Sequence, residues 1–206
     1  SEMCIRDSIN NDSSADSMLN SINGSTSAAT QMLKAKVSKT GYENTDKSSE
    51  DLQNAIDKLA GKKSTVFKDA RESKDTSKVT AAAQELIDKY NSLVEVMSKT
   101  SSSLDEFYKK ALKGLPKSIK ESLEKVGITY NSDGTLEVDS DKLKKADVDS
   151  LEKIFGSDSE FMKKLSFVTD RIESNAEANL QSVSSTYSST ADIMSSFNSS
   201  KYDFLG

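Results

Sequence analysis

The chain of 206 residues contains no histidine and no tryptophan, and it has only one cysteine and one proline. Without histidine it cannot form a Ser-His-Asp or Cys-His nucleophile system, a histidine general base or the usual zinc sites. Cys4 has no second cysteine with which to form a disulfide or a thiolate cluster. Pro116 is the only proline in the sequence, and proline is the residue that most often interrupts a helix. These absences exclude most catalytic chemistry and permit long helices.

Other features of reactive sites are also missing. The eight glycines are scattered and form no phosphate-binding loop. Residues 61–64 read Gly-Lys-Lys-Ser, but the upstream glycine of such a loop is absent, and a helix C-terminus is the better interpretation. Carboxylates alternate with lysines along predicted helices, which is typical of a solvated face. We therefore expect no enzyme: no catalytic residue, no metal ligand, no cofactor and no small-molecule substrate.

The overall composition favours narrow helical packing. Hydrophobic residues make up 34% of the chain and charged residues 30%, which suits helices that each bury a single stripe. The net charge of −5 argues against a nucleic-acid partner. No apolar run reaches the ~18 residues of a membrane span, and no cleavable signal peptide is visible.

One short segment, residues 127–138, predicts a β-hairpin. Ile128 and Leu136 belong to two short runs of alternating apolar and polar residues. Asp133 and Gly134 lie between the runs, and an Asp-Gly pair in this position is a strong hairpin signal because glycine tolerates a positive φ. We expect these four residues to form a structural brace.

The same segment also allows a calcium-site interpretation, because Asn131, Asp133 and Gly134 fit three positions of an EF-hand loop. The first ligand position would be Thr129 and the last Ser140, so the first carboxylate and the bidentate glutamate are both missing. A plain turn is the better interpretation, and added calcium should not raise the melting temperature.

Apolar stripes at helical spacing flank the hairpin. One stripe predicts a long helix over 79–113 that ends at Gly114, after which Pro116 opens a second helix. A broken helix ending at Gly156 follows the hairpin, and a last long helix is predicted over 158–198, capped by Ser157 or Asp158. We expect the two long helices to run antiparallel.

The first third of the chain is less regular. Apolar residues near its start predict a helix interrupted near Gly24, followed by a polar linker at 38–50 and a short amphipathic helix ending at Gly61. Residues 1–8 have neither helical nor strand periodicity, and we interpret them as a leader that is not native.

Together these patterns predict an all-α fold, an elongated helical bundle or antiparallel coiled coil with one small β-hairpin. After the leader, the expected organisation is an irregular helical segment at 9–76, a helical bundle at 77–189 with the hairpin at 127–138, and an assembly tail at 190–206.

Three short motifs follow one another along the chain. The first is Leu-Ile-Asp-Lys-Tyr-Asn-Ser-Leu at 86–93, and the last covers 193–202. Between them lies the hairpin segment, with Gly127, Ile128, Asp133, Gly134, Leu136, Asp139, Lys142 and Leu143. In this order the three motifs resemble the C-terminal region of the flagellar filament-capping proteins, the hook-associated protein 2 family. The family's N-terminal motif and its β-rich middle domains are absent, so the chain resembles a short or truncated relative.

The resemblance implies a non-enzymatic structural protein of the bacterial flagellum that is extracellular and acts by helix-mediated assembly. Its partners would be itself, as a homo-oligomer, or flagellar filament or hook subunits. The partner-binding residues would be the apolar residues of the tail, namely Ile193, Met194, Phe197, Tyr202, Phe204 and Leu205. The alternative is an unrelated secreted or cell-surface helical interaction module.

Overall fold

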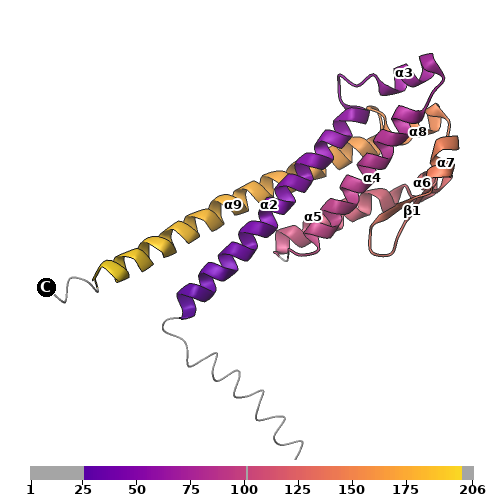
Figure 1. Cartoon of the computed structure of the whole chain (residues 1–206). Coiled ribbons are helices and arrows are strands. Elements are labelled where there is room, and N and C mark those ends of the chain that lie inside the picture. The colour runs from indigo at the N-terminus through magenta and orange to yellow at the C-terminus, as the bar shows by residue number, and fades with distance from the viewer. Residues whose placement is uncertain (1–25, 101, 201–206) are drawn as a thin grey trace, which may run out of the picture. The chain divides into compact units, whose positions relative to one another are not determined.

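The computed structural model describes residues 26–100 and 102–200. Its elements in chain order are α2 (Thr26–Ala60), α3 (Val66–Ser73), α4 (Ser77–Met97), α5 (Ser103–Ser118), α6 (Lys120–Lys125), β1 (Ile128–Tyr130), β2 (Leu136–Val138), α7 (Ser140–Lys145), α8 (Val148–Phe155) and α9 (Glu160–Ser200) (Figure 1). In the described residues the only sheet is the antiparallel pair of β1 and β2. The prediction of a helical fold with one hairpin is confirmed.

The chain divides into two compact units. One unit is residues 40–180, which contain all the buried hydrophobic residues found in the described chain, from Leu52 to Ala176. The described part of the other unit comprises the start of α2 up to residue 39 and the part of α9 from residue 181 onward. Leu33 and Val37 on this part of α2 are 63% and 66% exposed.

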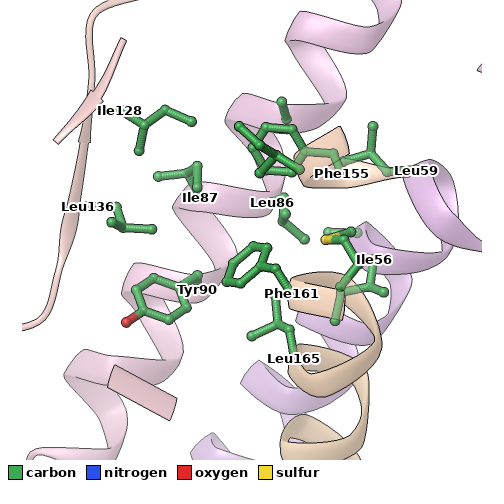
Figure 2. Close-up of a cluster of buried hydrophobic side chains, with 14 of the residues drawn as sticks. Ile56, Leu59, Leu86, Ile87, Tyr90, Ile128, Leu136, Phe155, Phe161 and Leu165 are labelled. Carbon is green, nitrogen blue, oxygen red and sulfur yellow. The ribbon is translucent and has the colours of Figure 1, made fainter. Parts of the chain in front are cut away.

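The core of the 40–180 unit gathers side chains from α2 through α9, including both strands of the hairpin. Figure 2 shows part of this core, with labelled side chains from α2, α4, the hairpin, α8 and α9. The labelled members are Ile56, Leu59, Leu86, Ile87, Tyr90, Ile128, Leu136, Phe155, Phe161 and Leu165. All of them are at most 7% exposed, so the hairpin is an integral part of the core.

The predicted stripe is accurate over α4. Its members are spaced three or four residues apart and are all at most 1% exposed: Val79, Ala83, Leu86, Tyr90, Leu93 and Met97. The prediction that one helix continues this stripe to residue 113 is wrong. Helix α4 ends at Met97 and α5 begins only at Ser103, so the predicted helix over 79–113 is two helices. The fully buried residues of α5 are Asp105, Leu112 and Pro116. Tyr108 and Leu115, which continue the spacing of the stripe, are partly buried against the core, whereas Leu104 is 47% exposed.

The break between α4 and α5 is stabilised by a capping box. The Ser102 hydroxyl accepts a hydrogen bond from the Asp105 backbone N–H, at 3.0 Å, and the Asp105 carboxylate accepts one from the Ser102 N–H, at 3.3 Å. A new helix therefore starts here, and its register is independent of that of α4. Ser102 is thus the N-cap of a new helix that begins at Ser103.

Two details of the next segment also differ from prediction. Gly114 does not end the helix, because α5 continues to Ser118 with Pro116 inside it. The proline is tolerated near the C-terminal end of α5, where its missing N–H removes one hydrogen bond of the last turns. The chain departs from helical geometry at Ile119, whose φ is −118°.

The polar linker predicted at 38–50 is wrong, because α2 is continuous through it. Thr45 and Ser49 extend the buried face of α2 toward its N-terminus, at 4% and 0% exposure. Their hydroxyls donate to backbone carbonyls four residues earlier, Gly41 O at 2.9 Å and Thr45 O at 2.7 Å. Serine and threonine can face a core when their hydroxyls bond to the backbone of their own helix. A pattern of apolar residues alone therefore does not reveal this part of the buried face.

Past the hairpin, the predicted broken helix is confirmed as α7 and α8, the latter ending before Gly156. Asp139 and Asp147 cap their N-termini, accepting from the N–H groups of Lys142 and Ser150. The cap of α9 is Ser159, not Ser157 or Asp158. Its hydroxyl accepts from the Met162 N–H at 3.3 Å.

Helices α2 and α4 run antiparallel. Near the end of α2, Lys58 forms an ion pair with Glu85 of α4 at 2.9 Å. About two turns earlier in α2, Asp51 lies 3.9 Å from Lys89, which is later in α4. The order of contacts is thus reversed between the two helices.

Helix α9 also runs antiparallel to α2. The Gln53 amide donates to Ser166 O at 2.8 Å, and Asp46, earlier in α2, meets Glu173, later in α9. It follows that α4 and α9 run parallel. Helix α5 then leads back along α4 (Figure 1). The predicted antiparallel arrangement of 79–113 with the last helix is therefore wrong for α4.

Candidate functional site

The hairpin is held against α4 by two adjacent polar side chains. The Tyr90 hydroxyl donates to Gly134 O at 2.8 Å. The Asn91 amide bonds twice to the same residue of β2, donating to Leu136 O at 2.7 Å and accepting from Leu136 N–H at 2.8 Å. Asn91 thus satisfies the edge of β2 in the way that a neighbouring strand would. Two motifs that are about 40 residues apart in the sequence meet at this point.

Burial decides the protonation state of the bracing tyrosine. Tyr90 is 1% exposed, and this burial raises the pKa of its hydroxyl far above the usual range. The phenol therefore stays protonated and available as a donor to Gly134. The helical spacing of Tyr90 predicts only that its ring is buried, and does not predict the hydrogen bond of its hydroxyl to Gly134. The available signal was an Asn directly after a buried Tyr, a polar pair at the edge of the buried face.

The turn of the hairpin satisfies its own polar groups. Asp133 accepts from the backbone N–H of Thr135 at 2.9 Å and from its hydroxyl at 2.6 Å. These bonds, the one from the hydroxyl first, lower the pKa of the Asp133 carboxyl. The Gly134 N–H donates to Asn131 O at 3.0 Å. The Asp133 carboxylate thus serves the turn.

Gly134 has the positive φ predicted for it, at +91°. The space beside it is also occupied. A Cβ at this position would lie 2.6 Å from the Cγ and Cδ atoms of Lys113, whose aliphatic stem crosses the turn from α5. The hairpin residues Ile128 and Leu136 are paired strand neighbours of Val138 and Tyr130, and both are buried in the core.

One group of carboxylates lies where α2 meets α9. Oxygens of Asp46, Glu173 and Glu177 approach within 4.8 Å of one another, which is the spacing that a shared cation would need. The pKa of Glu173 is raised, by burial first and then by the negative charges of Asp46 and Glu177. Glu177 is exposed and the other two are half-buried, so the arrangement is a site of charge repulsion on a helical surface.

The predicted partner-binding residues fall at or beyond the end of the described chain. Ile193, Met194 and Phe197 lie on the described backbone of α9, and their side chains are outside the description. Tyr202, Phe204 and Leu205 lie outside the described residues. Their role stays a prediction. In the described part of the chain, no helix combines the length and the apolar character that crossing a membrane requires.

Residues 107–204 match the family described as flagellar hook-associated protein 2 C-terminus, a family of structural flagellar cap proteins. This match confirms the resemblance carried by the hairpin and terminal motifs, and it covers α5 from Phe107 through α9. The motif at 86–93 lies outside the matched range. No curated protein and no solved structure matches the chain.

Proposed function

We propose that this chain is a flagellum-associated structural protein that acts, like the filament cap, by assembling through helices, and that it works outside the cell at the filament tip without enzymatic activity. The observation that carries the proposal is the family match over residues 107–204. The match includes the hairpin, which Tyr90 and Asn91 attach to the core. A unit whose hairpin is fixed to its helices by these hydrogen bonds is suited to a structural role.

The length of α9 supports assembly through helices. Its last buried hydrophobic residue in the described chain is Ala176, yet the helix continues to Ser200. At 1.5 Å per residue this extension is ~36 Å long. Serine lowers the helical propensity of this segment, so packing against other chains would stabilise it. We propose that residues 190–206 provide the assembly contacts, either with a second copy of this chain or with filament or hook subunits.

The apolar residues of this segment are the proposed contact points: Ile193, Met194, Phe197, Tyr202, Phe204 and Leu205. Burying them on a partner would contribute about 25 cal/mol per Å² of apolar surface, before the costs of association are subtracted. The proposed attachment is therefore hydrophobic and should persist at high salt.

The test compares the intact chain with a chain lacking residues 190–206, by size-exclusion chromatography with light scattering and by pull-down with purified filament and hook subunits. We expect the truncated chain to lose association with both itself and these subunits. A triple substitution of Ile193, Met194 and Phe197 by serine should have the same effect. The matched control replaces the polar neighbours Ser195, Ser196 and Ser199 by alanine and should leave association unchanged. If the truncated chain associates as the intact one does, the assembly role of the tail is wrong.

A further inference from the structure

Helix α5 has an exposed face with an apolar side chain at its centre. Phe107 is 64% exposed, and its ring packs edge-to-face with that of Tyr108, at a centroid distance of 5.5 Å. Leu104, one turn before it, is 47% exposed. The opposite face of the same helix provides the buried residues Asp105, Leu112 and Pro116. The two faces are thus clearly separated.

A groove of about 650 Å³ lies along this face. Phe107 on α5 and Tyr130 at the end of β1 are its aromatic residues, so the groove lies between the helix and the hairpin. Its length is set by α5, because its lining extends from Ser103 to Lys117. At 1.5 Å per residue this distance is ~21 Å, enough for four turns of a partner helix.

The groove is strongly basic in a chain whose net charge is −5. Four of the residues that line it are lysines, at positions 109, 110, 113 and 117. Lys109 forms an ion pair with Glu106 within its own helix. The stem of Lys113 packs on the hairpin turn, where Asp133 partly offsets its charge. Neither Lys110 nor Lys117 forms an ion pair with another residue of the described chain.

The spacing of the groove lysines indicates what kind of partner would fit them. Lys110, Lys113 and Lys117 are three and four residues apart, so they lie on one side of α5 over ~10 Å. A second helix laid along the groove would oppose them with carboxylates at the same spacing. It would also need one apolar side chain near Phe107 and Tyr130.

We propose that this groove, the α5 groove, binds an acidic amphipathic helix of a partner protein. The apolar anchor of the partner covers Phe107, and its carboxylates pair with Lys110 and Lys117. The concave shape between α5 and the hairpin favours a helix over a lipid bilayer, which presents a broad surface and is usually held by four to eight basic residues. The groove is separate in sequence from the 190–206 tail, so this proposal is independent of the one above.

The experiment uses the full 206-residue chain and a synthetic helical peptide as the probe. The peptide carries glutamates at positions i, i+3 and i+7 with one leucine on the same side, and a second peptide has glutamine in place of each glutamate. Binding is measured by fluorescence anisotropy at low and at high salt. The test variant is Lys110→Glu with Lys117→Glu. The matched control is Lys62→Glu with Lys63→Glu, which makes the same change of net charge at exposed lysines outside the groove lining.

We expect the acidic peptide to bind and the glutamine peptide to bind at least about tenfold more weakly, because the carboxylates steer and hold the complex. The groove variant should also lose about tenfold and most of the salt dependence, while the control variant keeps both. Phe107→Ala should weaken binding but retain the salt dependence, since it removes only the apolar contact.

Three outcomes would overturn the proposal. The first is that the acidic peptide does not bind the intact chain. The second is that both double variants lose the same affinity, which would show that net charge alone controls binding. The third is that vesicles with anionic lipid bind more tightly than the peptide and lose this binding in the groove variant, which would make the face a membrane contact.

Discussion

At the scale of single residues, a few polar contacts specify how the hairpin sits on the helices. Tyr90 and Asn91 contribute three hydrogen bonds to Gly134 and Leu136, and all three are between 2.7 and 2.8 Å. Buried donors and acceptors are costly when they are left unpaired, so these bonds select one placement of the hairpin over others that would bury similar area. Burial of apolar side chains drives folding, and the hydrogen bonds of Tyr90 and Asn91 fix the position of the hairpin along α4.

The first prediction concerns Gly134, whose φ of +91° a β-branched side chain rarely adopts. Gly134→Val should lower the free energy of unfolding by about 1–3 kcal/mol through backbone strain, with a further contribution from displacing the Lys113 stem. Urea unfolding followed by circular dichroism measures the change.

The control for that variant is Gly114→Ala, a glycine inside α5 with no atom within 4 Å of an added Cβ. This substitution should stabilise the protein by about 0.5–1 kcal/mol, because alanine loses less conformational entropy in a helix. Equal effects of the two substitutions would contradict the assignment of the turn.

The second prediction concerns Tyr90. Tyr90→Phe removes the donor to Gly134 O and should cost about 1–2 kcal/mol at pH 8. The pKa of the buried hydroxyl is raised above the unfolded value of about 10, so the contribution of Tyr90 is fully present below pH 10 and is lost as the pH rises above it.

The difference in the free energy of unfolding between the parent and the Tyr90→Phe variant should therefore narrow by about 1 kcal/mol between pH 8 and pH 10.5. Over this interval Tyr90 ionises in the unfolded parent but not in the folded parent, and the variant has no hydroxyl at this position. Urea unfolding at the two pH values measures it. Lysine titration affects both proteins equally and cancels in the comparison. A difference that stays constant over this interval would show that Tyr90 is not held in a buried, protonated state.

At the scale of elements, helix starts are set by short-range caps and helix partners by long-range contacts. The capping box of Ser102 and Asp105 separates α5 from α4. Asp105 then joins a distant helix, because its buried carboxylate also accepts from the Asn175 amide of α9 at 3.0 Å. One carboxylate thus fixes both where α5 begins and which part of α9 it faces.

The third prediction concerns the carboxylates between α2 and α9. The raised pKa of Glu173 means that its protonated form is favoured in the folded state, so its stabilising contribution is present at acid pH and is lost as the pH rises through the folded pKa. At neutral pH its charge opposes the contact with Asp46 and Glu177. Glu173→Gln should therefore raise the melting temperature slightly at pH 7, and this gain should disappear near pH 4.

Thermal melts at the two pH values provide the measurement for Glu173→Gln. The matched control is Glu121→Gln, an exposed glutamate on α6 that is outside the carboxylate group. It should leave the melting temperature unchanged at both values. A gain that is equal at pH 4 and pH 7 would mean that repulsion among these carboxylates does not affect folding.

At the scale of the whole molecule, the buried hydrophobic residues of the described chain belong to one unit, residues 40–180. The core includes α3 through α8 together with parts of α2 and α9. Such a unit contains its own buried core and should fold independently of the flanking segments.

The fourth prediction follows from this distribution. A fragment of residues 40–180 should retain a cooperative thermal transition and a far-UV circular dichroism spectrum dominated by helix. Its melting temperature should lie close to that of the full chain, since no member of the core is removed. Loss of the cooperative transition in the fragment would show that the flanking segments are required for the core to form.

The sequence by itself determined the types of element and several of their boundaries. The Asp-Gly pair at 133–134 identified the hairpin, because few backbone conformations suit such a pair between two alternating runs. The stripe over α4 and the stop at Gly156 were equally local signals. Where the sequence prediction failed, at 38–50 and at the start of α5, the deciding residues were serines and threonines, whose hydroxyls either bond to their own helix or cap a new one.

Only the tertiary structure decided which elements meet. The direction of α4 relative to α9 depends on ion pairs and hydrogen bonds between residues far apart in the chain, such as Lys58 with Glu85 and Gln53 with Ser166. The pairing of Asn91 with Leu136 likewise has no local signature. Periodicity shows that a helix has a buried face, but not what covers it. The covering surface is selected by the packing and hydrogen bonding of the whole core at once.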